Sequence, residues 1–207
     1  MQILAASLDP EATYKLLVGA VVPRPIAWVT TRNAAGGVNL APFSAFTYVS
    51  VKPPMLGINC GTKEGTLKDT GVNIHREGEF VVHIADETLV EPLHASAVEY
   101  PPEVSEVEVL GLETLPSADL RTPRLARAPI AMECRFHSAT PYGDTGSEFI
   151  VGEVLRFHLR DGLCEAGKID SEKLRPLARL GGPVYAKLGE LMRLAPVAQT
   201  PKAVKAR

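Results

Sequence analysis

Cysteine is scarce in this chain: Cys60, Cys134 and Cys164 are the only three among 207 residues, and no two of them form a CxxC pair. An odd number of widely spaced cysteines argues against a disulfide framework and against a cysteine-based metal site. This usage fits a reducing compartment, and we expect a cytoplasmic protein. The first ten residues lack the basic start and apolar run of a secretory signal, and no segment is apolar for long enough to span a membrane.

The chain also lacks a strong excess of charge of either sign. Its formal net charge is −2 and its isoelectric point is near 6.2, which argues against nucleic acid or an anionic membrane as the main partner. Apolar residues make up 45% and charged residues 22% of the chain, as in ordinary globular proteins. We predict one domain over residues 1–194, followed by a flexible tail over residues 195–207 that has no apolar anchor.

Several motifs that identify enzyme classes are absent. The chain has no GxGxxG, GxxxxGK(S/T), HExxH or GxSxG sequence, which argues against Rossmann, P-loop, zincin and α/β-hydrolase sites. Its five histidines show no ligand spacing; His83 interrupts an apolar strand and is better explained as a half-buried histidine with satisfied hydrogen bonds. Cys60 has no evident base beside it. We therefore predict no catalytic side chain and no metal site, so that the function depends on a bound group.

Glycine and proline are both frequent, with 17 of each, which predicts many short elements joined by turns. Strands are expected over residues 26–31, 39–44, 55–60, 79–84, 130–137 and 148–160, and short helices over 11–17, 86–100 and 171–179. A further helix is expected within residues 62–77, after a polar loop. The helix over 86–100 should start in earnest near Pro92, and the turn-rich segment 101–127 should wrap the surface. Because the elements do not alternate as βαβ, the pattern favours a mainly β, barrel-like domain over a doubly wound sheet.

Two of the expected strands carry further detail. In 130–137, Ala131, Glu133 and Arg135 alternate with apolar residues, which predicts one face in water. In 148–160, Gly152 predicts a bend, a bulge or a close approach of another group.

The stretch from Val21 to Ser50 is the candidate centre of the function. Pro23 and Pro25 hold Arg24 on a stiff extended segment, and Gly36-Gly37 supplies a turn between two strand-like runs. Pro42 in the second run indicates an edge strand or a bulge, where backbone groups stay free for a ligand. An ordinary hairpin with a capping arginine explains the same residues equally well.

A second candidate site is the triplet Lys68-Asp69-Thr70, at the start of an expected helix. A lysine and a hydroxyl at a helix start can hold a phosphate through charge-assisted hydrogen bonds. Such triplets are also common on protein surfaces, so that the residues alone leave both readings open.

Eight sequence segments, in order, resemble the flavin reductase-like family, the FMN-binding split-barrel flavoproteins. They are PRPIAWVTT, GxxNLAPFSAF, SVKPP, KDTxxNI, EFVVHI, GLETLPSADLRTPRLARAPIAMECR, FIVGEVLRFHLRDG and LARLGGPVY. The resemblance covers roughly residues 12–190 and implies a mainly β fold, a split β-barrel of Greek-key type with a few short helices.

The resemblance also implies which residues bind FMN. They are Arg24, Pro25, Ile26, Thr30, Asn39, Leu40, Ala41, Pro42, Ser44, Lys68, Asp69 and Thr70. Ser44, Lys68 and Thr70 would contact the phosphate and Thr30 would help to hold it. Residues 39–42 would present backbone groups to the isoalloxazine edge, and residues 24–26 would line the flavin side. Arg179 and Tyr185 resemble a segment that closes over the flavin region in the family.

The implied activity is NAD(P)H-dependent reduction of FMN, with NADH or NADPH as co-substrate, in a homodimer. Some members of the family supply reduced flavin to a partner oxygenase, so that the resemblance also implies an oxygenase as a candidate partner. One alternative is a flavoredoxin-like electron carrier without a nicotinamide site; another is a binding module without redox chemistry. Some relatives carry a histidine associated with nicotinamide use just before the strand that here begins at Phe149. This chain has Gly146-Ser147-Glu148 there, which weakens the case for a nicotinamide donor without removing it.

Overall fold

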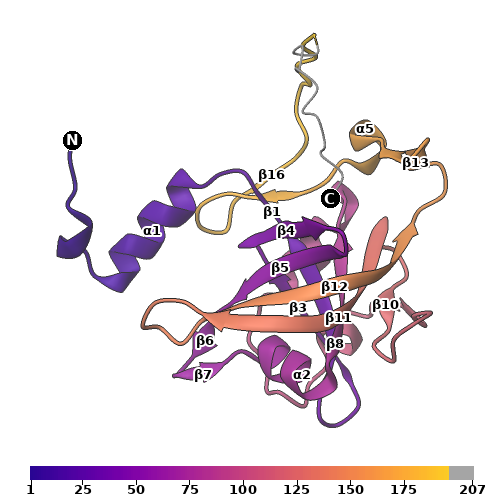
Figure 1. The fold of residues 1–207 in the computed structure, drawn as a ribbon, viewed down its shortest axis with the longest axis horizontal. Coiled ribbons are helices and arrows are strands. Elements are labelled where there is room, and N and C mark those ends of the chain that lie inside the picture. Colours follow the sequence, from indigo (N-terminus) through magenta and orange to yellow (C-terminus); the bar gives the residue numbers. More distant parts are fainter. Residues whose placement is uncertain (196–207) are drawn as a thin grey trace, which may run out of the picture.

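The structure is a computed structural model that describes residues 1–195; the predicted tail, apart from its first residue, lies outside the described residues. Its main feature is a seven-stranded antiparallel sheet in the order β3-β2-β8-β11-β12-β5-β4 (Figure 1). Its strands are β2 (Ala27–Arg32), β3 (Val38–Phe43), β4 (Phe46–Val51), β5 (Pro54–Cys60), β8 (Glu79–Ile84), β11 (Ile130–Pro141) and β12 (Glu148–Leu159). The expectation of a mainly β fold with short helices is confirmed.

Short strands and helices surround this sheet. The strands are β1 (Arg24–Pro25) with β15 (Ala178–Arg179) and β16 (Tyr185–Ala186), β6 (Thr62–Lys63) with β7 (Thr66–Leu67), β9 (Thr114–Leu115) with β10 (Arg124–Leu125), and β13 (Cys164–Glu165) with β14 (Lys168–Ile169). The helices are η1 (Ala5–Ser7), α1 (Pro10–Ala20), α2 (Asp69–Glu77), η2 (Glu87–Leu89), α3 (Val90–Ala95), α4 (Glu106–Val109) and α5 (Ser171–Leu174). No helix within the described part of the chain has the length and apolarity needed to cross a membrane.

The predicted hairpin of residues 26–44 is present as β2 and β3. β3 is an edge strand of the sheet, as Pro42 predicted, because proline has no amide hydrogen to give to a neighbouring strand. The turn is closed by Asn33, whose side chain accepts a hydrogen bond from the amide of Gly37 at 2.8 Å. Gly36 has a φ of 89°, which favours glycine there.

Strand β2 is buried on both of its faces, because two hydrophobic cores meet there. Ala27 and Val29 belong to the core on one side; Trp28, with Ile26 just before the strand, belongs to the core on the other. The first core is built mainly from the strands of the large sheet, and the second also contains residues of α3, α4 and the segment before β11. Continuous apolar runs of this kind are typical of strands that are covered on both sides.

Segment 101–127 therefore differs from its expected role as a surface excursion. Val107 and Leu125 are 5% and 3% exposed and belong to the second core. The helix expected over 86–100 is split into η2 and α3, with Pro92 in the first turn of α3. The helix expected over 171–179 ends at Leu174, and the chain then forms β15.

The expected wet face of β11 is also wrong at Glu133, whose side chain is fully buried. Its carboxylate accepts hydrogen bonds from the amides of Ala118 and Asp119, both at 2.7 Å, and lies 2.6 Å from Nε2 of His158. Burial favours the protonated form, but these hydrogen bonds outweigh it and lower the pKa of Glu133. The buried carboxylate thus holds the loop before β10 against the sheet.

The close approach expected at Gly152 is present. A Cβ atom there would overlap the ring of Phe80, which belongs to the first core. Gly57 on β5 is similar, because a Cβ would overlap the ring of Phe149. Larger side chains at these two positions would force the buried ring of Phe80 and the partly buried ring of Phe149 to move.

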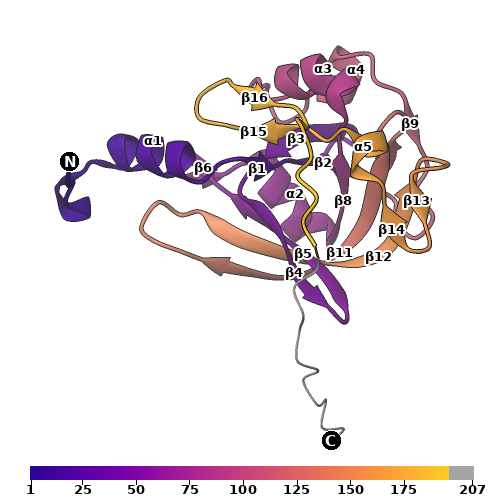
Figure 2. The same ribbon diagram turned by 90° about the horizontal axis from the view of Figure 1, so that it is seen from above.

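Helix α1 projects from the body of the protein in both views (Figures 1 and 2). None of its residues is buried, although Tyr14, Leu16 and Leu17 are large and apolar. Asp9 caps its first turn by accepting a hydrogen bond from the amide of Ala12 at 2.7 Å. A helix of 11 residues is marginal in water without tertiary packing, so that the exposed apolar side chains of α1 are a feature that the function has to explain.

Candidate functional site

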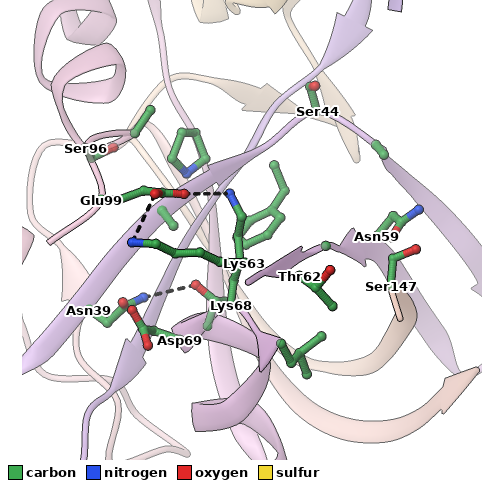
Figure 3. Close-up of a pocket in the computed structure, with 18 of the residues that line it drawn as sticks. Asn39, Ser44, Asn59, Thr62, Lys63, Lys68, Asp69, Ser96, Glu99 and Ser147 are labelled. Carbon is green, nitrogen blue, oxygen red and sulfur yellow. Dashed lines mark hydrogen bonds and ion pairs between the residues drawn. The ribbon is translucent and has the colours of Figure 1, made fainter. Parts of the chain in front are cut away.

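A cavity of about 620 Å³ lies where the edge strand β3 meets the start of α2. Its wall comes from β3 and the residues after it, the β6–β7 hairpin, the segment after α3, and the loop between β11 and β12. Figure 3 shows polar side chains from each of these elements around the same space. The volume falls within the roughly 300–1,000 Å³ of sites for cofactors and drug-sized ligands.

Two lysines provide the positive charge at this cavity. Lys63 lies on the β6–β7 hairpin and Lys68 is the residue before α2. Their Nζ atoms lie 3.0 Å and 3.7 Å from the two carboxylate oxygens of Glu99, which follows α3 (Figure 3). The hydrogen bond from Lys63 and the charges of both lysines lower the pKa of Glu99. Three elements that are separate in the sequence thus form one charged cluster.

The start of α2 adds hydrogen-bond donors to the same wall. Lys68 occupies the N-cap position, and its side chain makes no capping hydrogen bond. The Gly71 amide donates to the Lys68 carbonyl at 2.8 Å, so that the amides of Asp69 and Thr70 are the ones that remain available to an anion. Thr70 is buried, and its hydroxyl accepts a hydrogen bond from the Asn39 side chain at 3.0 Å. Asp69 completes the predicted triplet at the cavity.

The structure brings most of the predicted site residues together. Those that line the large cavity are Asn39, Ala41, Pro42, Ser44, Lys68, Asp69 and Thr70. Arg24 and Ile26 instead line a smaller cavity of about 280 Å³, whose wall shares Pro42, Ser44 and Lys68 with the large one. The two cavities are therefore neighbours.

Three predicted residues line neither cavity. Thr30 is fully buried, and its hydroxyl donates to the carbonyl of Pro123 at 2.8 Å. Leu40 is fully buried in the second core, and its amide donates to Glu106. Pro25 is exposed on β1, paired with Ala178. Alternation along β2 and β3 turns the side chains of Thr30 and Leu40 away from the cavity, and Pro25 lies on β1. A contact of these three residues with a flavin stays a prediction.

Arg24 has a structural task that the sequence did not reveal. Its guanidinium donates hydrogen bonds to the carbonyls of Val18, Val21 and Leu180 at 2.6, 2.6 and 2.9 Å, and to Oγ of Ser44 at 3.2 Å. It therefore connects α1, the C-terminal segment and the end of β3 at the small cavity. Its influence on a ligand would pass through Ser44 and through the shape of this corner.

Arg179 and Tyr185 form a second polar cluster beside Arg24. Arg179 donates to the Tyr185 hydroxyl at 2.6 Å, and its guanidinium carbon lies 4.7 Å from the centre of the Tyr185 ring. His94 contacts the same hydroxyl at 3.0 Å. Tyr185 is half-buried and packs against the second core, which favours a packing role for it. Arg179 lines the small cavity.

Sequence reasoning missed several residues of the large cavity. Lys63, Glu99 and Glu106 line it. Glu106 is 6% exposed, and burial raises the pKa of its carboxyl, which accepts the amide of Leu40 at 2.8 Å. The position of Lys63 beside the turn that contains Gly65 could have indicated that this lysine reaches a ligand. Nothing in the local sequence marked Glu99 or Glu106.

Neither a reactive cysteine at Cys60 nor a metal site offers an alternative candidate site in the described residues. Burial raises the pKa of Cys60 to about 11, so that its thiol is inert near neutral pH. Within residues 1–195, no group of three or more His, Cys, Asp and Glu side chains is arranged to hold a metal ion.

His83 confirms its expected role as a satisfied histidine, although it is completely buried and not half-buried. Its Nδ1 lies 2.9 Å from the carbonyl of Trp28, and its Nε2 accepts the amide of Leu125 at 2.9 Å. Because Nε2 accepts, the ring is neutral and Nδ1 carries the proton. Burial, with a smaller contribution from Arg124, lowers the pKa of His83 to about 4.

This pKa predicts a loss of stability in mild acid. Below pH 6.5 the unfolded chain takes up a proton at His83 that the folded chain refuses until about pH 4. The free energy of unfolding should therefore fall between these values, by up to about 1.4 kcal/mol per pH unit from this residue. Urea unfolding from pH 7 to 4.5 should show a shallower dependence for His83→Gln. An imidazole NMR titration with a midpoint near 6.5 in the folded protein would contradict the prediction.

Comparisons with known proteins identify the family and the fold to which this cavity belongs. Residues 18–177 match the model of the Flavin reductase like domain. The structure resembles nitrilotriacetate monooxygenase component B of Bacillus cereus, with 38% identity and a TM-score of 0.91 over 94% of this chain and 98% of that one. It also resembles 2-nitrobenzoate 2-nitroreductase of Pseudomonas fluorescens, with 34% identity and a TM-score of 0.83 over 98% and 100% of the two chains.

A third solved structure supports the architecture alone. A proposed flavin reductase of Shewanella frigidimarina, with a split barrel domain, has 19% identity and a TM-score of 0.82, covering 95% of this chain and 100% of that one. The expected split-barrel architecture is confirmed by this likeness.

Proposed function

The chain belongs to the flavin reductase-like family, and on that premise we propose that it binds FMN in the large cavity and catalyses NAD(P)H-dependent flavin reduction. The observation that carries this proposal is the convergence of Lys63, Lys68 and the start of α2 on one wall of a cavity of cofactor size. A dianionic phosphate fits a wall that offers two cations and free backbone amides.

The rest of the cavity suits a flat ring system. Ala41 and Pro42 on β3 present small or rigid side chains, and Ser44 joins the large cavity to the small one. Asn39 and Asn59 add amide groups that can bond to polar edges of a ligand. A mostly apolar surface with a few placed polar groups is typical of cofactor sites.

Bound FMN would supply the redox chemistry, accepting electrons from NADH or NADPH and passing them on. The protein contributes by placing the two ligands and by excluding water, because transfer between nicotinamide and flavin depends on proximity more than on an acid or base. The small cavity, lined by Arg179 and adjoining the large one, is the candidate location for part of the nicotinamide donor.

Three electron acceptors or roles are compatible with this proposal. Similarity to a monooxygenase component supports an oxygenase partner that receives reduced flavin. Similarity to a nitroreductase supports direct reduction of a small molecule instead. A flavoredoxin-like carrier is the alternative favoured by Gly146-Ser147-Glu148, where the donor-associated histidine is missing; His75 lies 2.7 Å from Glu148 but does not line the cavity.

One experiment tests the proposal and separates these readings. The purified protein is stripped of flavin, titrated with FMN and riboflavin, and then treated with NADH or NADPH without oxygen. Saturable FMN binding followed by loss of the oxidised flavin absorbance supports the reductase. Binding without reduction by either nucleotide supports the carrier, and failure to bind any flavin overturns the proposal.

We also propose a homodimer with the flavin near the subunit boundary. Tyr14 projects from the unpacked helix α1 and lines both cavities, and the edge strand β4 exposes Tyr48, Val49 and Val51. A second copy that covers α1 would also close the cavity. Light scattering at micromolar concentration should therefore give about twice the mass of 22.2 kDa.

The dimer prediction has a matched pair of variants. Leu16→Glu together with Leu17→Glu on α1 should produce monomers with weakened FMN binding, because the buried interface would contain two charges. Glu172→Lys, an exposed residue of α5 that lines neither cavity and pairs only with the exposed Arg193 among the ion pairs found, should remain dimeric. A wild-type monomer that keeps full FMN affinity would contradict the proposal.

A further inference from the structure

The phosphate subsite proposed above already contains an anion that belongs to the protein. The Glu99 carboxylate lies between Lys63 and Lys68, with one oxygen toward each Nζ atom, at 3.0 and 3.7 Å (Figure 3). We call these three residues the carboxylate bridge. They come from the β6–β7 hairpin, the residue before α2 and the segment after α3, so that the bridge spans the cavity wall.

The bridge is suited to opening. The side chains of both lysines are 47% exposed and that of Glu99 is 52% exposed, and ion pairs as exposed as these are weak and screened by salt. Glu99 also lies in an exposed segment, residues 97–99. Its carboxylate can turn into water without leaving an unsatisfied buried group.

A phosphate would compete with this carboxylate on favourable terms. A phosphomonoester carries a charge of about −1.5 to −2 at pH 7 and has three acceptor oxygens, whereas the carboxylate has one charge and two oxygens. The two anions cannot share the lysines without repelling each other. A phosphate that binds both lysines therefore has to displace Glu99.

We propose that Glu99 is a built-in competitor for the phosphate subsite, which selectively weakens the binding of phosphorylated flavin and speeds its release. This inference rests on the proposed binding of FMN in the large cavity. When a binding-competent state is only partly populated, the apparent affinity falls by that fraction. If the bridge is open about one tenth of the time, FMN binds about tenfold more weakly than it would without Glu99.

The consequence concerns how the protein uses its flavin. Weaker binding and faster release suit a flavin that is exchanged with the solution after each reduction, rather than one held permanently. Riboflavin has no phosphate and does not need the lysines, so that Glu99 should leave its affinity unchanged. Glu99 should therefore affect the binding of the phosphate end of FMN and leave the binding of the ring system unchanged.

The test compares Glu99→Gln with the wild type in the flavin-free protein. Titration followed by flavin fluorescence should show about tenfold tighter FMN binding in the variant and unchanged riboflavin binding. Stopped-flow displacement should show slower FMN release. The difference between variant and wild type should shrink as the salt concentration rises, because screening weakens the bridge. Glu91→Gln, an exposed carboxylate on α3 that lines neither cavity, is the matched control and should bind FMN like the wild type.

The outcomes separate this inference from the proposed function. Wild-type protein that binds FMN, with Glu99→Gln unchanged or weaker in FMN binding, overturns the competitor role and leaves the function standing. Equal tightening of FMN and riboflavin also overturns it, because the effect would then not concern the phosphate. Wild-type protein that binds no FMN at all overturns the proposed function, and the inference with it.

Discussion

Replacing Lys63 and Lys68 together by glutamine should weaken FMN binding by roughly a hundredfold and leave riboflavin binding within about twofold. Hydrogen bonds to charged groups contribute about 1.5–3 kcal/mol each, and the partial exposure of both lysines places them at the lower end, near tenfold apiece. Each lysine approaches the cavity from a different element, so that the two losses of binding free energy should add. Glu99 would lose both of its partners and would repel the phosphate, which can only enlarge the combined loss.

Fluorescence titration of the flavin-free variants with both ligands measures this effect. Lys168→Gln, an exposed lysine on β14 outside both cavities, controls for the general loss of positive charge. Thr70→Ala is a poorer test, because the hydroxyl also accepts a hydrogen bond from Asn39 in the buried wall. Equal weakening of FMN and riboflavin by the lysine variant would mean that the phosphate lies elsewhere.

Replacing Arg24 by alanine should slow the reduction of bound FMN by NAD(P)H at least tenfold. The guanidinium connects three carbonyl groups and Ser44 at the corner shared by the two cavities. Its loss would leave these carbonyls without their donor and would release Ser44, so that the two ligands would be placed less accurately. Small errors of placement cost large factors in rate when proximity supplies most of the catalysis.

Stopped-flow absorbance of bound flavin, under anaerobic NADH and then NADPH, measures the rate. His137→Ala is the control, since this exposed histidine contacts only Ser138 among the hydrogen-bond partners found and lines neither cavity; its rate should match the wild type. A wild-type rate in Arg24→Ala would contradict the placement role. Reduction by dithionite but by neither nucleotide would favour the electron carrier instead.

Local patterns in the sequence were enough to predict the elements around the site. Alternating and continuous apolar runs predicted β5, β8, β11 and β12, and Gly36-Gly37 with Pro42 predicted a hairpin that ends in an edge strand. These features depend on neighbours in the chain, whose spacing fixes which side chains share a face. The triplet Lys68-Asp69-Thr70 and the family resemblance predicted a phosphate-binding role for the start of α2, and the structure places these three residues on the wall of the large cavity.

The tertiary structure decided which of these faces meet the cavity. Strand β2 lies between two cores, and β3 lies between a core and the large cavity. Alternation alone could not tell that Thr30 and Leu40 point into protein while Asn39 and Ala41 reach the cavity. Segment 101–127 looked like surface because its buried apolar residues, Val107 and Leu125, lie far apart along the chain. They contribute to the core only when sheet and loop pack together.

The sequence by itself determined the family, the mainly β architecture and the lysine at the start of α2, since each is written in neighbouring residues. It could not determine that Lys63 and Lys68 share Glu99, because that carboxylate lies more than thirty residues further along the chain. Nor could it show that Glu106 holds the amide of Leu40, or that Arg24 is bound by carbonyls from both ends of the domain. Charges and hydrogen bonds act over a few ångströms in space, and only folding brings these groups within that distance.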